Sequence, residues 1–232
     1  STEAERQVPL AGPPLWLLAS ALVLHRVDRG LESLDRRIPI TPADIITWSP
    51  VTEKHVGGTG MSLAALCEAT ITTSDNAAAN LILDSYGGPA ALTAYLRTLG
   101  DSVTRIDRRE PELNAKHPDE PMDTTTPRAM VMNLHRLVLG DALSAASRAL
   151  LTKWLEGNTT GGNSPAWHGA ALGSHKHAAA LSGFKSKEFG GAGYTQLVLD
   201  DTDQQQRVQL RTSQHNSELN LGHLVHQADN YR

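Results

Sequence analysis

The stretch from Thr72 to Leu83 restricts the fold most, because three polar residues there directly precede an apolar helical run. Ser74, Asp75 and Asn76 lie where a helix should begin, and such residues satisfy the free N–H groups of a first helical turn. Taken alone, the triplet predicts a helix cap. The functional alternative is that Ser74 and Asn76 face a substrate, with the hydroxyl passing a proton and the amide holding a carbonyl group.

Helical periodicity dominates the middle of the chain. An apolar run opens at Pro13-Pro14, where proline is tolerated in a first helical turn. Apolar residues also recur with helical spacing in three further segments, which are 61–67, 76–86 and 89–99. Thr126-Pro127 and Ser144 begin two later helices, which should end at Gly140 and near Gly157. Residues 13–157 are therefore predicted to be nearly all helix.

The pattern changes to alternation of polar and apolar residues after residue 157. This alternation predicts strands at 178–184, 194–199 and 207–211, with a turn at 200–203. Helical spacing returns from Asn216 to Asp229. We therefore predict an α+β fold, in which a helical domain covers 13–157 and a smaller antiparallel-sheet domain covers 158–232 together with residues 1–12.

Composition excludes several kinds of partner. The 232 residues carry a formal net charge of −4 without a basic cluster, so neither nucleic acid nor an anionic membrane is an expected partner. The single cysteine, Cys67, excludes an internal disulfide and is expected to be a buried, inert thiol. The apolar run at 15–24 is half as long as the roughly 20 residues of a membrane span, and no basic segment precedes it as in a signal peptide. The oligomeric state stays open.

Two downstream motifs connect the Ser74-Asp75-Asn76 triplet to a known family. They are Asp107-Arg108-Arg109-Glu110-Pro111-Glu112-Leu113-Asn114 and Asp123-Thr124-Thr125-Thr126-Pro127. Together with the triplet they resemble the class A serine β-lactamases. The resemblance extends from about Trp16 to Gly161, which is well over half of the chain.

The resemblance implies an architecture and a reaction. Class A enzymes place an all-helical domain beside an antiparallel sheet that is backed by the two terminal helices, and they are exported to the periplasm or the cell exterior. They hydrolyse β-lactams through a serine acyl-enzyme and a water activated by a glutamate, without a cofactor. The expected ligand is therefore a β-lactam or a peptidoglycan-like peptide.

Individual roles follow from the same resemblance. Glu110 matches the glutamate that activates the water, and Asn114 matches the amide that helps to hold it. Arg108 and Asp123 match a salt bridge that closes this loop. Trp48 matches an aromatic residue at the mouth of the cleft. The alternatives are that Glu110 is an ordinary exposed acid and that Trp48 is a core aromatic residue.

The nucleophile motif departs from the family pattern. In the family, a serine and a lysine three residues later lie on one helical face. The alignment places Gly12 and Leu15 at these positions, and an alternative register places Pro13 and Trp16 there; neither pair can attack a carbonyl carbon. Family members also place a helix and two strands before the nucleophile, whereas this chain has eleven residues there. We therefore expect a sheet of three strands and a cleft without a competent nucleophile.

The third family motif, Lys-Thr-Gly, has its best counterpart in Leu181-Ser182-Gly183, which keeps the hydroxyl and the glycine but loses the charge. Ser182 and Gly183 would then contact substrate. Ser182 and Lys185 also satisfy the spacing Ser-x-x-Lys, but residues three apart in a regular strand face opposite sides, which argues against a substitute nucleophile. Three histidines could bind a metal, although surface histidines are the favoured interpretation, and no metal site is predicted; they are His168, His175 and His177.

Four hypotheses remain from the sequence. The first is a class A β-lactamase-like protein that lacks a competent nucleophile. The second is a non-catalytic protein that binds a β-lactam or a peptidoglycan-like peptide. The third is an active hydrolase that uses Ser182 or a metal. The fourth is an engineered, truncated or mis-sequenced form of a working enzyme.

Overall fold

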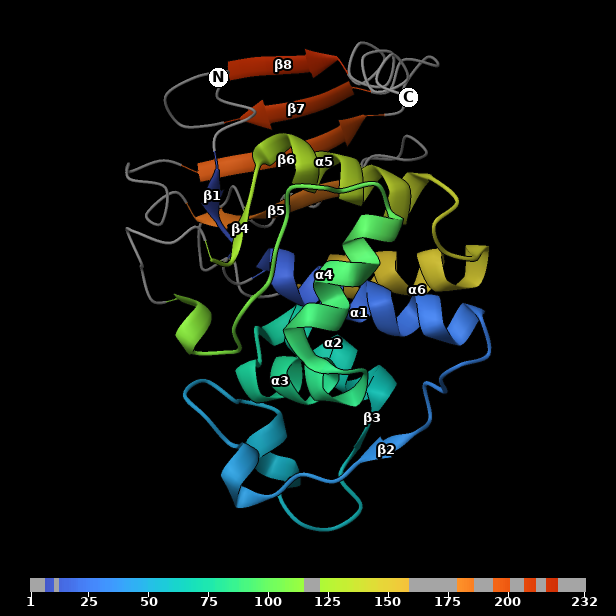
Figure 1. Ribbon diagram of the computed structural model, residues 1–232, viewed down its shortest axis with the longest axis vertical. Coiled ribbons are helices and arrows are strands. Elements are labelled where there is room, and N and C mark those ends of the chain that lie inside the picture. The colour runs from blue at the N-terminus through green and yellow to red at the C-terminus, as the bar shows by residue number, and fades with distance from the viewer. Residues whose placement is uncertain are drawn as a thin grey trace. The chain divides into compact units, whose positions relative to one another are not determined.

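The computed structural model describes residues 7–10, 13–114 and 122–158, and the backbone of four strands between residues 179 and 220. Side chains are described for most of the first three ranges. The chain divides into two compact units, Ser1–Asn158 and Thr159–Arg232 (Figure 1). Each unit is described by itself below.

The first unit is built mainly of helices. Their bounds are α1 (Pro13–Asp28), α2 (Leu63–Thr73), α3 (Asn76–Ser85), α4 (Gly88–Thr98), α5 (Pro127–Leu134) and α6 (Ala145–Glu156), with a π-helical turn at His135–Leu139. Residues 15–24 of α1 are apolar except for Ser20 and are all buried, and the helix packs against α2, α3, α4 and α6 (Figure 1). Among the described residues, no helix has the length and hydropathy needed to cross a membrane.

Local capping explains where several helices begin. The side chains of Asp75, Thr126 and Ser144 accept hydrogen bonds from backbone amides in the first turns of α3, α5 and α6. Thr126 and Ser144 are the starts that the sequence predicts. Within the Ser74-Asp75-Asn76 triplet, Asp75 is the cap, whereas Ser74 ends α2 in a left-handed conformation with φ of 61°.

The prediction that 13–157 is nearly all helix is wrong for the described residues 99–114 and 122–126, which contain only a 3-10 turn and a two-residue strand, and for residues 29–62. This segment contains two short 3-10 turns, Pro42–Asp44 and Thr52–His55, and a small antiparallel sheet of β2 (Arg37–Ile38) and β3 (Met61–Ser62). Glycines break the helical pattern here. At Gly60, φ is +65° and an added Cβ would lie 1.9 Å from the Ile38 carbonyl oxygen, so this crossing requires glycine.

A second small sheet lies near the start of the chain. β1 (Val8–Pro9) pairs antiparallel with β4 (Thr124–Thr125), and the Leu10 amide donates to the Asp123 carbonyl oxygen at 2.6 Å. The sequence predicts that residues 1–12 belong to the second domain, whereas these contacts of β1 are made within the first unit. A 3-10 turn, Glu112–Asn114, lies between α4 and β4.

Cys67 is a free, fully buried thiol in α2, as the sequence predicts. Burial raises the pKa of this thiol to about 12. At neutral pH the group is therefore protonated and behaves as a small apolar side chain.

The carboxylate of Asp28 joins the end of α1 to the start of α6. It accepts hydrogen bonds from the Ser144 amide at 2.7 Å, the Ser144 hydroxyl at 2.6 Å and the Ser147 hydroxyl at 2.6 Å. Burial alone would raise the pKa of Asp28, but these hydrogen bonds outweigh it and lower the pKa below its ordinary value. The ionised form is therefore stabilised by folding.

This linkage predicts a pH dependence of stability. Because the pKa of Asp28 is lower in the folded state, its contribution is complete above the unfolded pKa, near 4, and is lost as pH falls through the folded pKa. Asp28→Asn should lower the free energy of unfolding at pH 7 by at most about 1 kcal/mol, because solvent screens an exposed carboxylate. Urea unfolding at pH 7 and pH 3 measures this difference. A difference that persists unchanged at pH 3 would contradict the prediction.

The second unit contains an antiparallel sheet in the order β5 (Ala179–Lys185), β6 (Tyr194–Asp200), β7 (Arg207–Arg211) and β8 (Asn216–Asn220). The first three strands agree with the alternation in the sequence. The expectation of a three-stranded sheet and of a helix over Asn216 to Asp229 is wrong at Asn216–Asn220, because this segment pairs with the whole of β7. Residues 201–206 and 221–232 lie outside the described residues.

Candidate functional site

A buried carboxylate fixes the turn between α2 and α3 to the loop 47–52. Asp75 is 0% exposed. Its Oδ1 accepts hydrogen bonds from the Thr52 hydroxyl at 2.8 Å and the Ala78 amide at 2.9 Å. Its Oδ2 accepts from the amides of Val51 and Thr52, both at 2.9 Å. One side chain therefore holds both the first turn of α3 and the loop 47–52.

Trp48 is an exposed aromatic residue that this loop places against the turn. Its backbone has a φ of 63°, which is rare for a bulky residue, and its side chain is 62% exposed. The Asn76 amide donates to the Trp48 carbonyl oxygen at 3.0 Å, and the indole N–H donates to the Thr73 carbonyl oxygen at 2.9 Å. Trp48 is therefore not a core residue, and its indole lies beside the triplet.

Ser74 and Asn76 have different surroundings in this turn. The Asn76 side-chain amide donates to the Thr47 carbonyl oxygen at 2.8 Å, so this amide fixes the loop. Ser74 is half-buried, and its hydroxyl is not needed as the cap of α3 because Asp75 takes that role. Both residues lie at the turn between α2 and α3, and the roles that the resemblance implies for them stay predictions.

Glu110 is buried, at 3% exposed, rather than the exposed loop acid of the alternative interpretation. Asn80, which the sequence does not single out, holds the backbone of Glu110. Its side chain accepts from the Glu110 amide at 3.0 Å and donates to the Glu110 carbonyl oxygen at 2.8 Å. The peptide bond between Glu110 and Pro111 is cis. Asn80 lies in α3, so this helix joins the triplet at its start to the segment that carries Glu110, residues 107–114, which we call the glutamate loop.

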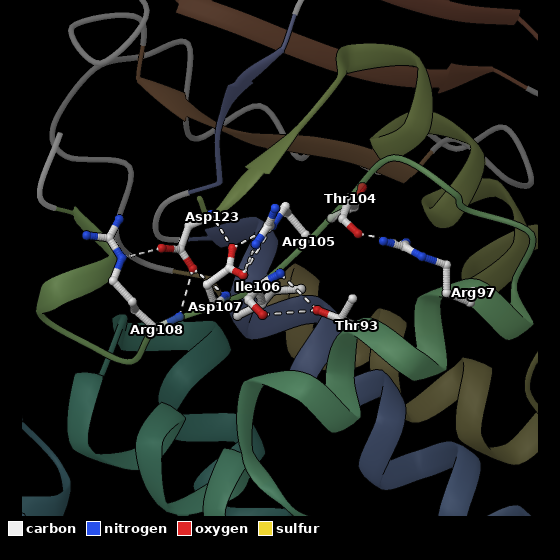
Figure 2. Close-up of polar contacts among 8 residues, drawn as sticks. All are labelled: Thr93, Arg97, Thr104, Arg105, Ile106, Asp107, Arg108 and Asp123. Atoms are coloured by element: carbon white, nitrogen blue, oxygen red, sulfur yellow. Dashed lines mark hydrogen bonds and ion pairs between the residues drawn. The ribbon is translucent and has the colours of Figure 1, made fainter. Parts of the chain in front are cut away.

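The Arg108–Asp123 pair closes the base of the glutamate loop (Figure 2). Arg108 Nε lies 2.6 Å from Asp123 Oδ2, and both side chains are largely shielded from solvent. Asp123 Oδ1 also accepts from the amides of Asp107 and Arg108, at 2.8 and 3.0 Å. The structure thus contains the ion pair that the resemblance implies. Asp123 has a φ of 50°, a conformation that Asp and Asn adopt more readily than most residues.

Further contacts hold the segment that leads into this loop. The Thr93 hydroxyl in α4 donates to the Ile106 carbonyl oxygen at 3.1 Å and accepts from the Ile106 amide at 2.9 Å (Figure 2). Arg97 donates to the Thr104 carbonyl oxygen at 2.7 Å. Burial tends to raise the pKa of Asp107, but hydrogen bonds from Arg105 and from the Asp123 amide lower it overall. The loop is therefore anchored to α4 and to β4 at several points.

The remaining predicted residues are only partly described. Asn114 lies in the 3-10 turn that follows Glu110, and its backbone alone is described. Gly12 and the three histidines His168, His175 and His177 lie outside the described residues. Ser182 and Gly183 lie in β5 of the second unit, again as backbone. Among the residues that the structure describes, no group of three or more His, Cys, Asp or Glu side chains could hold a metal ion.

The first turns of α1 contain no lysine. Leu15, which the resemblance predicts at the position of the family's lysine, is 1% exposed, and Trp16, which is predicted there in the alternative register, is also buried. Ser20 is the first hydroxyl of α1 and is fully buried, and Val23 stands three residues after it. A Ser-x-x-Lys pair is therefore absent from the described residues of α1.

Comparisons with known proteins address the same region of the chain. A family model described as "Beta-lactamase enzyme family" matches residues 16–164. The chain is 48% identical over 148 residues to a β-lactamase of Klebsiella oxytoca, which covers 64% of this chain and 51% of that protein. It is 50% identical over 142 residues to β-lactamase L2 of Stenotrophomonas maltophilia, with coverages of 61% and 46%. The chain thus spans about half the length of these curated relatives.

Solved structures agree with the sequence comparisons. A putative class A β-lactamase from Rhodopseudomonas palustris superposes with a TM-score of 0.72 at 47% identity, covering 85% of this chain and 72% of that chain. A variant of the last common ancestor of Gram-negative class A β-lactamases, bound to the transition-state analogue 5(6)-nitrobenzotriazole, superposes with a TM-score of 0.72 at 48% identity, covering 86% and 73%.

A second family model matches the end of the chain. It is described as "Putative type VI secretion system Rhs element Vgr" and matches residues 187–232, which include β6, β7 and β8. Ser182 and Gly183 lie between the two matched ranges. Neither model matches residues 165–186, which include β5.

Proposed function

The chain belongs to the class A β-lactamase family, and on that premise we propose that it binds a β-lactam or a peptidoglycan-like peptide without hydrolysing it through an acyl-enzyme. The first unit keeps the polar turn at Ser74 and Asn76 and a buried Glu110. Family resemblance assigns both to the handling of a β-lactam. What differs is the start of α1, where the family places its nucleophile.

One observation carries the proposal. Opening a β-lactam through an acyl-enzyme requires a nucleophile and a base that takes its proton. The residue predicted to stand at the position of the family's lysine is Leu15, a hydrocarbon side chain that is 1% exposed, and the residue predicted at the position of its serine is Gly12; the alternative register gives Trp16 and Pro13. None of these residues can form a bond to a carbonyl carbon or accept a proton.

The retained parts support binding. Trp48 offers an exposed indole face beside the Ser74–Asn76 turn, and aromatic faces bind flat ligand groups well. Asn80 fixes the backbone of Glu110, so the acid is held in place. Location in the periplasm or outside the cell is part of the same proposal and rests on the family resemblance alone.

Hydrolysis of a chromogenic cephalosporin tests the proposal. We expect turnover at background level, compared with about 10 per second for a typical enzyme, because the covalent step lacks its nucleophile. The K. oxytoca relative serves as the positive control. Intact mass spectrometry after incubation with the cephalosporin should show no added mass, while thermal stability should rise saturably with ligand concentration.

Three results would contradict the proposal. Turnover near that of the positive control would show that a nucleophile is present. An acyl adduct on any residue of the first unit would show the same for a single turnover. If the thermal stability of the protein does not rise saturably up to millimolar ligand, the protein does not bind the cephalosporin as proposed.

A further inference from the structure

Four buried polar atoms in the interior of the first unit have no hydrogen-bond partner among the residues that the structure describes. Two belong to α1, one to α2 and one to the residue that follows α3; they are Trp16 Nε1, Ser20 Oγ, Thr70 Oγ1 and the Tyr86 hydroxyl oxygen. Trp16 is 6% exposed, and Ser20 and Thr70 are 0% exposed. A buried polar group without a partner is costly, so native proteins rarely contain one.

The direction of α6 shows that α1 and α2 are antiparallel. The start of α6 is bonded to the end of α1, because Ser144 donates two hydrogen bonds to Asp28. Its end is bonded to α2, because the Asn158 side-chain amide donates to the Ile71 carbonyl oxygen at 2.6 Å. The 12 residues of α6 pack beside α1 (Figure 1), and their length of about 18 Å spans α1 from Asp28 back to Trp16. The start of α1 therefore lies beside the end of α2.

Helical spacing then places the polar side chains of α1 and α2 opposite one another. Trp16 and Ser20 are four residues apart on α1, and Cys67 and Thr70 are three apart on α2, so each pair shares a helix face. The side chain of Ser20 lowers the pKa of the Cys67 thiol against the larger effect of burial, so Ser20 lies beside Cys67. Because the two helices are antiparallel, Trp16 lies at the level of Thr70.

Tyr86 joins this cluster from the end of α3. Burial raises the pKa of the Tyr86 hydroxyl well above its ordinary value, and the nearby Cys67 raises it further. The hydroxyl is therefore protonated at neutral pH, and it can both donate and accept a hydrogen bond. The thiol of Cys67 is only a weak donor and acceptor, so it is a poor partner for the hydroxyls around it.

We propose that this junction of α1, α2 and α3 is an internal water-binding site, in which at least one water molecule bridges Ser20, Thr70 and Tyr86. A buried water typically makes about three hydrogen bonds to buried polar groups. Three hydroxyl groups supply donors and acceptors for it, and the indole N–H of Trp16 adds a further donor. The thiol and the phenol are both protonated at neutral pH, so the cluster suits a neutral ligand rather than an ion. This site is independent of the ligand binding proposed above.

Oxygen-17 magnetic relaxation dispersion of water tests the site on the full chain, because it counts the waters that stay bound for longer than the protein takes to tumble. We expect the triple variant Ser20→Ala, Thr70→Val, Tyr86→Phe to lose at least one such water relative to the unaltered protein. Ser102→Ala removes an exposed hydroxyl and is the matched control, which should keep the full number. Circular dichroism checks that both variants are folded.

The sign of a stability change gives a second test that needs only a single substitution. If the Tyr86 hydroxyl is bonded to a water, Tyr86→Phe removes a satisfied group and should raise the equilibrium constant for unfolding about fivefold. If the hydroxyl has no partner, the same change removes a costly buried group and should lower this constant. Thr93→Val is the reference for a satisfied hydroxyl, because Thr93 bonds to both the amide and the carbonyl oxygen of Ile106. Urea unfolding measures all three proteins.

Two outcomes would overturn the proposal. The first is a folded triple variant that retains as many long-lived waters as the unaltered chain. The second is an unfolding constant that Tyr86→Phe lowers or leaves unchanged while Thr93→Val raises it, which would show that the phenol makes no hydrogen bond in the folded protein. The second test also decides the matter if the triple variant does not fold.

Discussion

Replacing Asp75 with alanine should lower the free energy of unfolding by about 3–5 kcal/mol. The carboxylate is fully buried and accepts four hydrogen bonds, from the Val51 amide, the Thr52 amide and hydroxyl, and the Ala78 amide. Each buried donor that loses its partner costs about 1–3 kcal/mol, and the lost helix cap costs about 1 kcal/mol, although such costs do not add fully. The loop 47–52 should be released from α3 as well.

Urea unfolding followed by circular dichroism measures this loss. Asp84→Ala is the matched control, because Asp84 is exposed and its main contact is an ion pair with Arg109. An exposed ion pair contributes about 0–1 kcal/mol, so the control should change stability little. If Asp75→Ala costs no more than Asp84→Ala, the carboxylate does not hold the turn in the way described.

Replacing Asp123 with alanine should destabilise the protein by about 3 kcal/mol and loosen the glutamate loop. The variant loses the ion pair with Arg108 and the acceptor for two amides, and alanine tolerates a φ of 50° less well than aspartate does. Charge-assisted hydrogen bonds to shielded groups contribute about 1.5–3 kcal/mol each, with incomplete additivity. Amide hydrogen exchange should therefore speed up at residues 105–110 and stay unchanged within α2.

Two further variants sharpen this test. Asp141→Ala removes an exposed aspartate at a distance from the loop in sequence and should change stability by less than about 0.5 kcal/mol. A double-mutant cycle with Arg108→Met isolates the energy of the Arg108–Asp123 pair itself. A coupling energy near zero, or exchange at 105–110 that does not change, would show that the pair does not close the loop.

Helix starts are predictable from the sequence because the groups that determine them are local. Thr126 and Ser144 each cap the helix that follows, and the residues involved lie within three positions of one another. The Ser74-Asp75-Asn76 triplet shows the limit of this argument. All three residue types can cap a helix, and the choice of Asp75 depends on Val51 and Thr52, more than 20 residues earlier.

The features that could not be predicted from the sequence depend on residues that are far apart along the chain. Leu219 fits a helical pattern and a strand pattern equally well, and only pairing with β7 decides for β8. Asn80 looks like an ordinary polar residue within a helix, yet its side chain holds Glu110, 30 residues later. In the same way, the irregular register between Ser182 and Phe184 is visible only from the pairing of β5 with β6.

The anchoring of Trp48 has an entropic consequence for recognition. Its loop is held at both sides by Asn76 and Asp75, so rotation of the backbone would require these contacts to break. A flexible loop loses conformational entropy when a ligand binds, whereas this loop has already lost that entropy during folding. A flat group that stacks on the indole therefore meets a preorganised surface, and its affinity is not reduced by the ordering of the loop.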